Sequence, residues 1–422
     1  MKRRIKTVLV SLTLAGTCEL CAQDIRLDYL QGDGMAYVDT EYQLKAADVV
    51  EVDFMVQHEE LAHVFGARTG SQDNNFSLSV GKSGTAYNLV ADYSFSSLEG
   101  RLQVPAGNVL NRRTTSRVGV QDRQVVRFDG QGAWTNNEAV YRGDILSTAT
   151  SCLLFHLNGS PFAGASPFRG RIYSFRILRN GEVALDLLPY KRNGVCGFRD
   201  EKSGRFITSS VGELTGPELG RQMKYIKGDG LAYLNTGVRI GSNDRIDVEF
   251  MPISEGTMHV FGSRTSADSN NFTGSIAQSL GVWSLMVDFC ASWCRQSVPL
   301  SSLMHKRVSV SASRSSRTVR VVGTDEVWED ANECPNEFTT PGDCYLCYIS
   351  GSPFTSAKMF DGRLYSFSVT RNGVKRADLV PWQRGAEVGM RDLVSWEFIG
   401  NAAESGTFSA KEIAPGLMLL FR

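Results

Sequence analysis

The sequence predicts an all-β protein made of two tandem antiparallel β-sandwiches of the jelly-roll type. Short runs that alternate apolar and polar residues recur between clusters of Gly, Asn, Ser and Pro, as in residues 50–56. This alternation is typical of half-buried strands, and no long segment shows the 3.6-residue apolar period of a helix. Many short strands within about 190 residues favour two packed sheets. The chain of 422 residues contains this pattern twice.

The duplication is read directly from the residues. Residues 29–37 match residues 225–233 at an offset of 196, and residues 159–162 match residues 351–354 at an offset of 192. The second copy is therefore four residues shorter between these points, most simply in surface loops. A repeat of this length is far longer than a solenoid unit, so each copy is predicted to be a whole domain.

The domain limits follow from the repeat and from a segment that contains Gly216, Pro217 and Gly220. Such a composition is typical of a linker. We expect a signal peptide over 1–22, a first jelly roll over 26–212, a linker over 213–222, a second jelly roll over 223–412 and a C-terminal tail over 413–422.

Each copy contains a predicted hairpin. Residues 170–181 return as residues 362–373, and in the first copy Tyr173, Phe175 and Ile177 fall on one face at period two. Both segments then reach an Asn-Gly pair, whose two residues tolerate the positive φ angles of a type I′ turn. The pattern predicts a strand, a tight turn and a second strand.

The N-terminus has the pattern of a secretion signal. Basic residues precede an apolar stretch over 7–15 that is too short to span a bilayer, and cleavage is expected after Ala22. A lipid anchor on Cys18 or Cys21 fits the pattern less well. We expect an exported protein that is secreted, periplasmic or at the cell surface, with no membrane insertion after signal removal.

Charge and composition exclude some partners. The chain has 45 basic and 45 acidic residues, so it offers no electrostatic reason to bind nucleic acid or an anionic membrane. Its 42% of hydrophobic residues is enough for a packed core.

Seven cysteines remain after removal of the signal: Cys152, Cys196, Cys290, Cys294, Cys334, Cys344 and Cys347. The number is odd, so at least one is free or pairs between chains. Two close pairs are an alternative zinc pattern, but they lie in predicted strands and disulfides or buried thiols are favoured.

An ordered set of motifs occurs once in each copy. The opening motif lies at residues 29–40 and 225–236, and Phe-Gly-[Ala/Ser]-Arg follows at residues 65–68 and 261–264. The closing motifs are Gly-Arg-[Ile/Leu]-Tyr-x-Phe, Asp-Leu-x-Pro and Gly-[Phe/Met]-x-Asp. In this order the motifs resemble the concanavalin A-like, laminin-G-like jelly-roll modules of bacterial and phage surface proteins. The resemblance implies a curved sandwich used mostly for binding, often of glycans.

Some glycoside hydrolases share this sandwich, and they need two carboxylates about 5.5 Å apart on one strand. Glu51 and Asp53 begin such a pattern, but the second Glu is absent because Met55 and Val56 stand in its place. His63 and His259 have no neighbouring nucleophile in the sequence. We therefore expect no catalysis and no catalytic residues.

The candidate ligand residues combine guanidinium, amide and carboxylate groups, which pair with neighbouring sugar hydroxyls. They are Arg68, Asn74, Asn75 and Asp92 in the first copy and Arg264, Asn270, Asn271 and Asp288 in the second. The competing interpretation is that each Arg forms a cross-strand ion pair with the Asp. No cofactor is expected, although Asp92 or Asp288 could contribute to a calcium site.

Three functions remain open at this level. The first is binding of a glycan or glycoconjugate, with avidity if both domains engage one polymer. The alternative is a protein-interaction or structural module at a surface, and a degenerate glycoside hydrolase is a further alternative. Five of the six Trp lie in the second copy, which indicates that the two copies need not bind the same partner.

Overall fold

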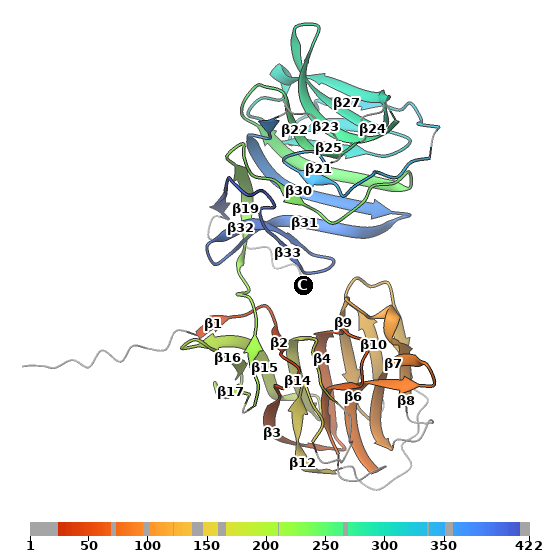
Figure 1. Cartoon of the computed structure of the whole chain (residues 1–422), viewed down its shortest axis with the longest axis vertical. Helices are drawn as coiled ribbons and strands as arrows, with labels where there is room; N and C mark the ends of the chain where they lie inside the picture. Colours follow the sequence, from red (N-terminus) through yellow and green to blue (C-terminus); the bar gives the residue numbers. More distant parts are fainter. Residues whose placement is uncertain are drawn as a thin grey trace, which may run out of the picture.

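The computed structural model describes residues 24–68, 73–95, 101–120, 122–136, 147–158, 166–209, 211–264, 269–335, 337–350 and 358–413. The predicted signal peptide and nearly all of the predicted tail lie outside these ranges. Within them the strands form four sheets, grouped into two sandwiches that Figure 1 shows one above the other. No described helix has the length and apolarity needed to cross a membrane.

The first sandwich pairs a large and a small sheet. The large sheet has the order β11 (Ala133–Thr135), β10 (Arg123–Arg127), β9 (Arg113–Val118), β4 (Asp48–Met55), β14 (Arg171–Arg179), β15 (Glu182–Arg192), β16 (Val195–Asp200) and β17 (Phe206–Thr208), joined by β1 (Asp24–Arg26), β2 (Leu30–Gly32) and β18 (Leu214–Thr215). The small sheet has the order β3 (Val38–Lys45), β12 (Ser147–Leu154), β5 (Ala62–Ala67), β6 (Asp73–Ser83), β7 (Ala86–Phe95) and β8 (Arg101–Pro105), with β13 (Ser166–Pro167) beside β5. A short 3₁₀ turn, η2 (Ala106–Asn108), follows β8.

The second sandwich repeats this plan. Its large sheet has the order β27 (Val327–Asp330), β26 (Arg317–Val321), β25 (Val308–Ala312), β21 (Asp244–Pro252), β30 (Gly362–Arg371), β19 (Arg221–Gly228), β31 (Val374–Arg384), β32 (Glu387–Asp392) and β33 (Phe398–Ile399), with β34 (Phe408–Glu412) on β19. Its small sheet has the order β20 (Leu234–Asn235), β28 (Tyr345–Leu346), β22 (Met258–Ser263), β23 (Ser269–Ser279) and β24 (Val282–Pro299), with β29 (Lys358–Met359) beside β22 and η3 (Leu300–Ser302) after β24.

Each sandwich encloses its own core, because alternate residues of the facing strands point inward. In β4 the residues Val50, Val52 and Phe54 are buried, and Glu51 and Asp53 between them face outward. One hydrophobic cluster draws only on residues 27–214 and the other only on residues 226–408. The predicted fold class, two tandem all-β sandwiches, is confirmed by this arrangement.

The predicted hairpins are present at both places. β14 and β15 are joined by Asn180 and Gly181, with φ angles of 53° and 82°. Asn372 and Gly373 join β30 and β31 with φ angles of 51° and 79°. Both pairs occupy the left-handed region that the Asn-Gly sequence predicts.

The predicted period of two is interrupted near the start of β14. The register shifts between Ile172 and Ser174, so Tyr173 is the additional residue of a β-bulge. Ile172 therefore joins the core together with Phe175 and Ile177, and Tyr173 is buried outside that cluster. Expecting Tyr173 on the same core face was wrong, because a bulge changes which residues point inward.

The two sandwiches meet through buried charges and aromatic rings. Arg391 of β32 has a side chain only 2% exposed, and it donates to both carboxylate oxygens of Asp28 at 2.6 and 2.7 Å. Trp396 lies in the turn after β32, and the guanidinium groups of Arg113 and Arg391 each lie 4.4 Å from its ring. Arg113 belongs to the first sandwich, so Trp396 contacts a cation from each sandwich.

Trp396 stands in an unusual backbone conformation for a large residue. Its φ is 63°, in the left-handed region that favours glycine. The corresponding residue of the first sandwich is Gly204, with a φ of 74°. The turn is thus the same in both copies, and the second places an aromatic ring where the first has no side chain.

Candidate functional site

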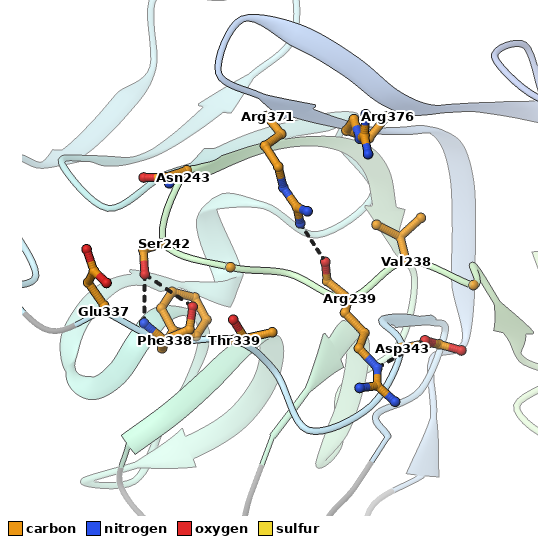
Figure 2. A pocket seen from close by; sticks show the side chains of 12 residues that line it. Val238, Arg239, Ser242, Asn243, Glu337, Phe338, Thr339, Asp343, Arg371 and Arg376 are labelled. Carbon is orange, nitrogen blue, oxygen red and sulfur yellow. Dashed lines mark hydrogen bonds and ion pairs between the residues drawn. The ribbon is translucent and has the colours of Figure 1, made fainter. Parts of the chain in front are cut away.

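A cleft of about 1040 Å³ lies at one end of the second sandwich. The segment between β20 and β21 forms one wall and residues 337–339 form another, as Figure 2 shows. Arg371 at the end of β30 and Arg376 in β31 reach it from the hairpin.

A buried ion pair holds the wall of this cleft. Arg371 donates from Nε and Nη2 to the two carboxylate oxygens of Asp244 at 2.7 and 2.8 Å, and Nη2 also donates to the Arg239 carbonyl at 3.0 Å. The Asp244 side chain is fully buried and accepts from the Gly241 amide at 2.8 Å. This hydrogen bonding raises the pKa of Arg371, so the guanidinium stays charged and bidentate.

The first sandwich has the same ion pair with a different cover. Arg179 donates to both oxygens of Asp48 at 2.8 and 3.0 Å, and the ring of Tyr42 lies 5.0 Å from the guanidinium. Burial raises the pKa of Tyr42 to about 12. At the matching position of the second sandwich stands Val238. Val238 has no ring to place over Arg371, so the space that an aromatic side chain fills in one copy is available in the other.

The cleft contains polar side chains that make no hydrogen bond within the described part of the chain. Asn243, Glu337 and Arg376 are exposed, and within the described ranges their side chains have no hydrogen-bond partner. Arg239 lies 3.8 Å from Asp343, a loose contact between partly exposed groups. An amide, a carboxylate and guanidinium groups around one hollow match the donors and acceptors of sugar hydroxyls.

A stack of tyrosine rings includes Tyr345, which follows Asp343 of the cleft wall by two residues along the chain. Tyr233 stacks on Tyr345 with ring centroids 4.9 Å apart and planes 22° apart, and Tyr348 lies 5.6 Å from Tyr233. The pKa of Tyr345 is raised, first by burial, then by Tyr233 and by Asp343 of the cleft wall. None of the three rings lines the cleft itself. Their partly exposed faces are apolar surfaces of the kind that stack on a sugar.

A second, smaller hollow of about 340 Å³ lies on the outer face of the large sheet of the first sandwich. Its charges satisfy one another: Glu51 pairs with Arg117, and Arg176 pairs with Asp186 at 3.1 Å. Burial raises the pKa of Asp53, which is opposed by hydrogen bonds from Arg113. Because these groups are already paired, this hollow offers fewer open contacts than the cleft.

The structure gives the predicted ligand residue Asp92 a different partner from the one expected. Asp92 pairs with Arg101 at 2.7 Å, and its side chain is 10% exposed. Burial raises its pKa, and the charges of Arg101, Arg68 and Arg123 oppose this. Arg68 is itself buried. The carboxylate thus lies among three arginines under the surface.

The second copy repeats the pair. Asp288 accepts from Nε and Nη2 of Arg295 at 2.6 and 3.0 Å, with a carboxylate side chain 2% exposed. A calcium ion at Asp288 would have to displace this guanidinium. Among the described residues, no group of three or more His, Cys, Asp or Glu is placed to hold a metal ion.

The remaining predicted residues are distributed as follows. Asn271 is fully buried, and Arg264 is half-buried. The side chains of Asn74, Asn75 and Asn270 lie outside the described ones. None of the five predicted residues whose side chains are described lines the cleft, and the role of all eight in ligand binding stays a prediction.

Sequence reasoning missed the cleft residues. The pattern that could have identified these residues is the difference between the copies, in which Tyr42, Lys45 and Ala47 are replaced by Val238, Gly241 and Asn243. Residues that the two copies share do not identify such positions, because a site present in one copy only appears as a sequence difference between the copies.

His63 and His259 occupy equivalent positions, and their pKa values are shifted in the same direction. Burial lowers the pKa of both His63 and His259 to about 4, with smaller contributions from nearby positive groups. Cys290 and Cys334 form a disulfide, and the other described cysteines, Cys152, Cys196, Cys294, Cys344 and Cys347, are free thiols.

Comparison with known proteins returns structures alone. No protein-family model matches the chain, and no curated protein matches its sequence. It is similar in structure to domains LG4-5 of the mouse laminin alpha1 chain, with 14% identity over 95% of this chain and 99% of that one and a TM-score of 0.32. It is also similar to the LG1-3 region of the laminin alpha2 chain, with 12% identity over 83% of this chain and 63% of that one and a TM-score of 0.29. A K499G mutant of NanB sialidase from Streptococcus pneumoniae shares 10% identity over 92% of this chain and 75% of that one, with a TM-score of 0.22. These TM-scores lie below 0.5, so the fold assignment stands on the sheet order of the chain itself.

Proposed function

We propose that this chain is an exported, non-catalytic binding protein for a glycan or glycoconjugate, with the cleft of the second sandwich as its site. The observation that carries the proposal is the cleft of about 1040 Å³, which is large enough for a small oligosaccharide. Its open polar groups pair with hydroxyls, and the stack of Tyr233, Tyr345 and Tyr348 offers ring faces outside the cleft lining.

Export is part of this proposal and depends on the basic and apolar pattern of the first residues. The absence of catalysis is likewise proposed from the side chains. Glu51 and Asp53 project from one strand, but each is held in an ion pair with an arginine, Arg117 and Arg113 respectively. A nucleophile and an acid in that arrangement would have to be released from their partners before reacting.

The test begins with a glycan array on the full chain and continues with calorimetric titration of each hit. Val238→Tyr introduces the residue that covers the ion pair in the first sandwich, so it should fill the cleft and weaken binding at least tenfold, which is about 1.4 kcal/mol. The matched control is Tyr42→Val, which changes the equivalent place in the first sandwich and should leave affinity unchanged.

Two further variants separate the cleft from the residues predicted by sequence. Arg68→Ala and Arg264→Ala should leave glycan affinity within a factor of two if the cleft is the site. A loss with either variant and none with Val238→Tyr would move the site to those residues. An array without signal at millimolar sensitivity would refute glycan binding and favour a protein partner.

A further inference from the structure

The face of the first sandwich that receives Trp396 is a cluster of tyrosines and arginines. Tyr173 is the additional residue of the β-bulge in β14. Its ring lies 4.1 Å from the guanidinium of Arg113 and 5.4 Å from the ring of Tyr29. The guanidinium of Arg171 lies 4.4 Å from the Tyr29 ring. Two cations are thus held beside two aromatic rings.

Two adjacent residues of one turn occupy this face. Trp396 stacks with Arg113, and Glu397 pairs with Arg171 at 3.2 Å. The first sandwich therefore recognises an aromatic ring followed by an acid, each with its own arginine.

The second sandwich carries the same two tyrosines and two arginines, with Val322 at the position of Phe128, whose ring lies 5.3 Å from the Trp396 ring in the first sandwich. The guanidinium of Arg307 lies 4.5 Å from the Tyr365 ring, and that of Arg363 lies 4.6 Å from the Tyr225 ring. The two tyrosine centroids are 5.6 Å apart. These residues stand at the repeat positions of Arg113, Tyr173, Arg171 and Tyr29. A register shift after Glu249 places Tyr365 in the same kind of bulge.

In the second sandwich this cluster is more open. The Arg307 side chain is 42% exposed, against 12% for Arg113 under Trp396. The carboxylate that pairs with it shows the same difference, because Glu249 is 28% exposed and Asp53 is 13% exposed. The Arg307 guanidinium is therefore accessible where Arg113 is covered, whereas Tyr365 is buried like Tyr173.

The charge beside the cluster differs between the copies. Asp28, which accepts from Arg391 in the first sandwich, corresponds to Lys224 in the second. Lys224 is exposed. The open face therefore carries Lys224, Arg307 and Arg363, and it favours a partner that has an acid where the first sandwich accepts an arginine.

We infer that this face of the second sandwich docks a partner protein that presents an aromatic residue followed by an acid on a tight turn. The contact seen at the first sandwich supplies the model of the occupant, because the same cluster binds such a turn there. This surface is separate from the glycan cleft and does not depend on it.

A second copy of this chain does not fit the face. Its own Trp396 and Glu397 are already engaged with its first sandwich. The equivalent turn of its first sandwich carries Gly204 and Arg205, which offer neither an aromatic ring nor an acid. The occupant is therefore a different protein.

The test uses a cyclised peptide with the sequence of residues 390–399, a turn whose ends pair as β32 and β33. The peptide is titrated into the full chain and binding is followed by calorimetry. We expect saturable binding that Arg307→Ala weakens at least tenfold. The change Arg391→Glu in the peptide should tighten binding three- to tenfold, because Lys224 replaces Asp28 at this place. The control Arg245→Ala removes an exposed arginine that pairs with Asp247 elsewhere on the sheet and should leave affinity unchanged.

Other outcomes overturn the inference. Binding that survives Arg307→Ala would show that the peptide lies elsewhere. A chain with Trp396→Ala frees the first face, and peptide that binds only this variant would show that the second face is not used. Absence of peptide binding to both the unchanged chain and the Trp396→Ala chain would refute the inference that the two tyrosine and arginine clusters recognise the same kind of turn. Removal of residues 414–422 should change nothing, and tighter binding after removal would identify the chain's own end as the occupant.

Discussion

The two sandwiches keep one framework and differ in what covers it. Arg179 with Asp48 and Arg371 with Asp244 are the same buried pair at the same place. Tyr42 covers the first and Val238 leaves space over the second. The framework is retained because a buried carboxylate must keep its partner. The cover is free to change: Tyr42, Lys45 and Ala47 of the first sandwich are replaced by the cleft residues Val238, Gly241 and Asn243 in the second.

The turn that follows β16 in the first sandwich and β32 in the second also combines a shared backbone with a different side chain. Gly204 and Trp396 share a left-handed backbone, but only Trp396 contacts arginines of both sandwiches. A residue other than glycine at such a φ costs on the order of 1 kcal/mol or more. The contacts with Arg113 and Arg391 offset this cost. The two copies therefore share the turn, and the side chain at this position decides whether the turn contacts the other sandwich.

The largest expected difference concerns the disulfide. Cys290→Ala with Cys334→Ala removes a link across 44 residues that the first sandwich does not have at the described positions. Loop-closure entropy makes such a link worth about 4 kcal/mol. The free energy of unfolding of the second sandwich should fall by this amount. Tryptophan fluorescence during denaturation measures it, because five of the six Trp lie in that half. An unchanged midpoint would contradict the expectation.

The next effect concerns the buried charge between the sandwiches. Arg391→Ala leaves Asp28 without its bidentate partner, which should cost about 3 kcal/mol. The matched change Arg199→Ala removes a side chain that is 34% exposed and lies 3.7 Å from Asp24, and it should cost less than about 1 kcal/mol. Chemical denaturation of both variants decides this. Equal losses would show that burial of Arg391 does not matter.

Acid should weaken both sandwiches through their equivalent histidines. His63 and His259 have a pKa near 4 in the folded chain, below the usual 6.5. Between these values the unfolded chain binds protons that the folded chain does not, so the free energy of unfolding falls as the pH falls from 6.5 toward 4. By pH 5 the loss is about 2 kcal/mol for each histidine. Unfolding curves from pH 7 to 5 measure it, and a double variant with His63→Gln and His259→Gln should flatten the dependence.

The smallest effect concerns the side chain at the position that covers the buried carboxylate, which is Tyr42 in the first sandwich and Val238 in the second. Tyr42→Val removes a ring that lies 5.0 Å from the Arg179 guanidinium, and the first sandwich should lose about 1 kcal/mol of stability. Val238→Tyr in the second sandwich should cost nothing or stabilise slightly. Thermal unfolding of both variants tests the comparison. A larger loss in Val238→Tyr would mean that the cleft cannot hold a ring.

Much of the fold was accessible from local patterns. The alternation of Val50, Val52 and Phe54 identified a strand with one buried face, and Asn180 with Gly181 identified a type I′ turn. Both signals act between near neighbours, so they need no knowledge of the rest of the chain. The cleft residues were not accessible in this way, because positions shared between the copies mark the common framework and the cleft lies where the copies differ.

The sequence by itself determined the duplication, the strand periods and the tight turns, because each depends on spacing along the chain. Only the tertiary structure decided that Tyr173 leaves the core at a bulge, that Asp92 pairs with Arg101, and that Trp396 lies between two sandwiches. These contacts join residues distant in sequence. They depend on how strands from different parts of the chain are positioned relative to one another, and the residue pattern of a single strand does not encode that position.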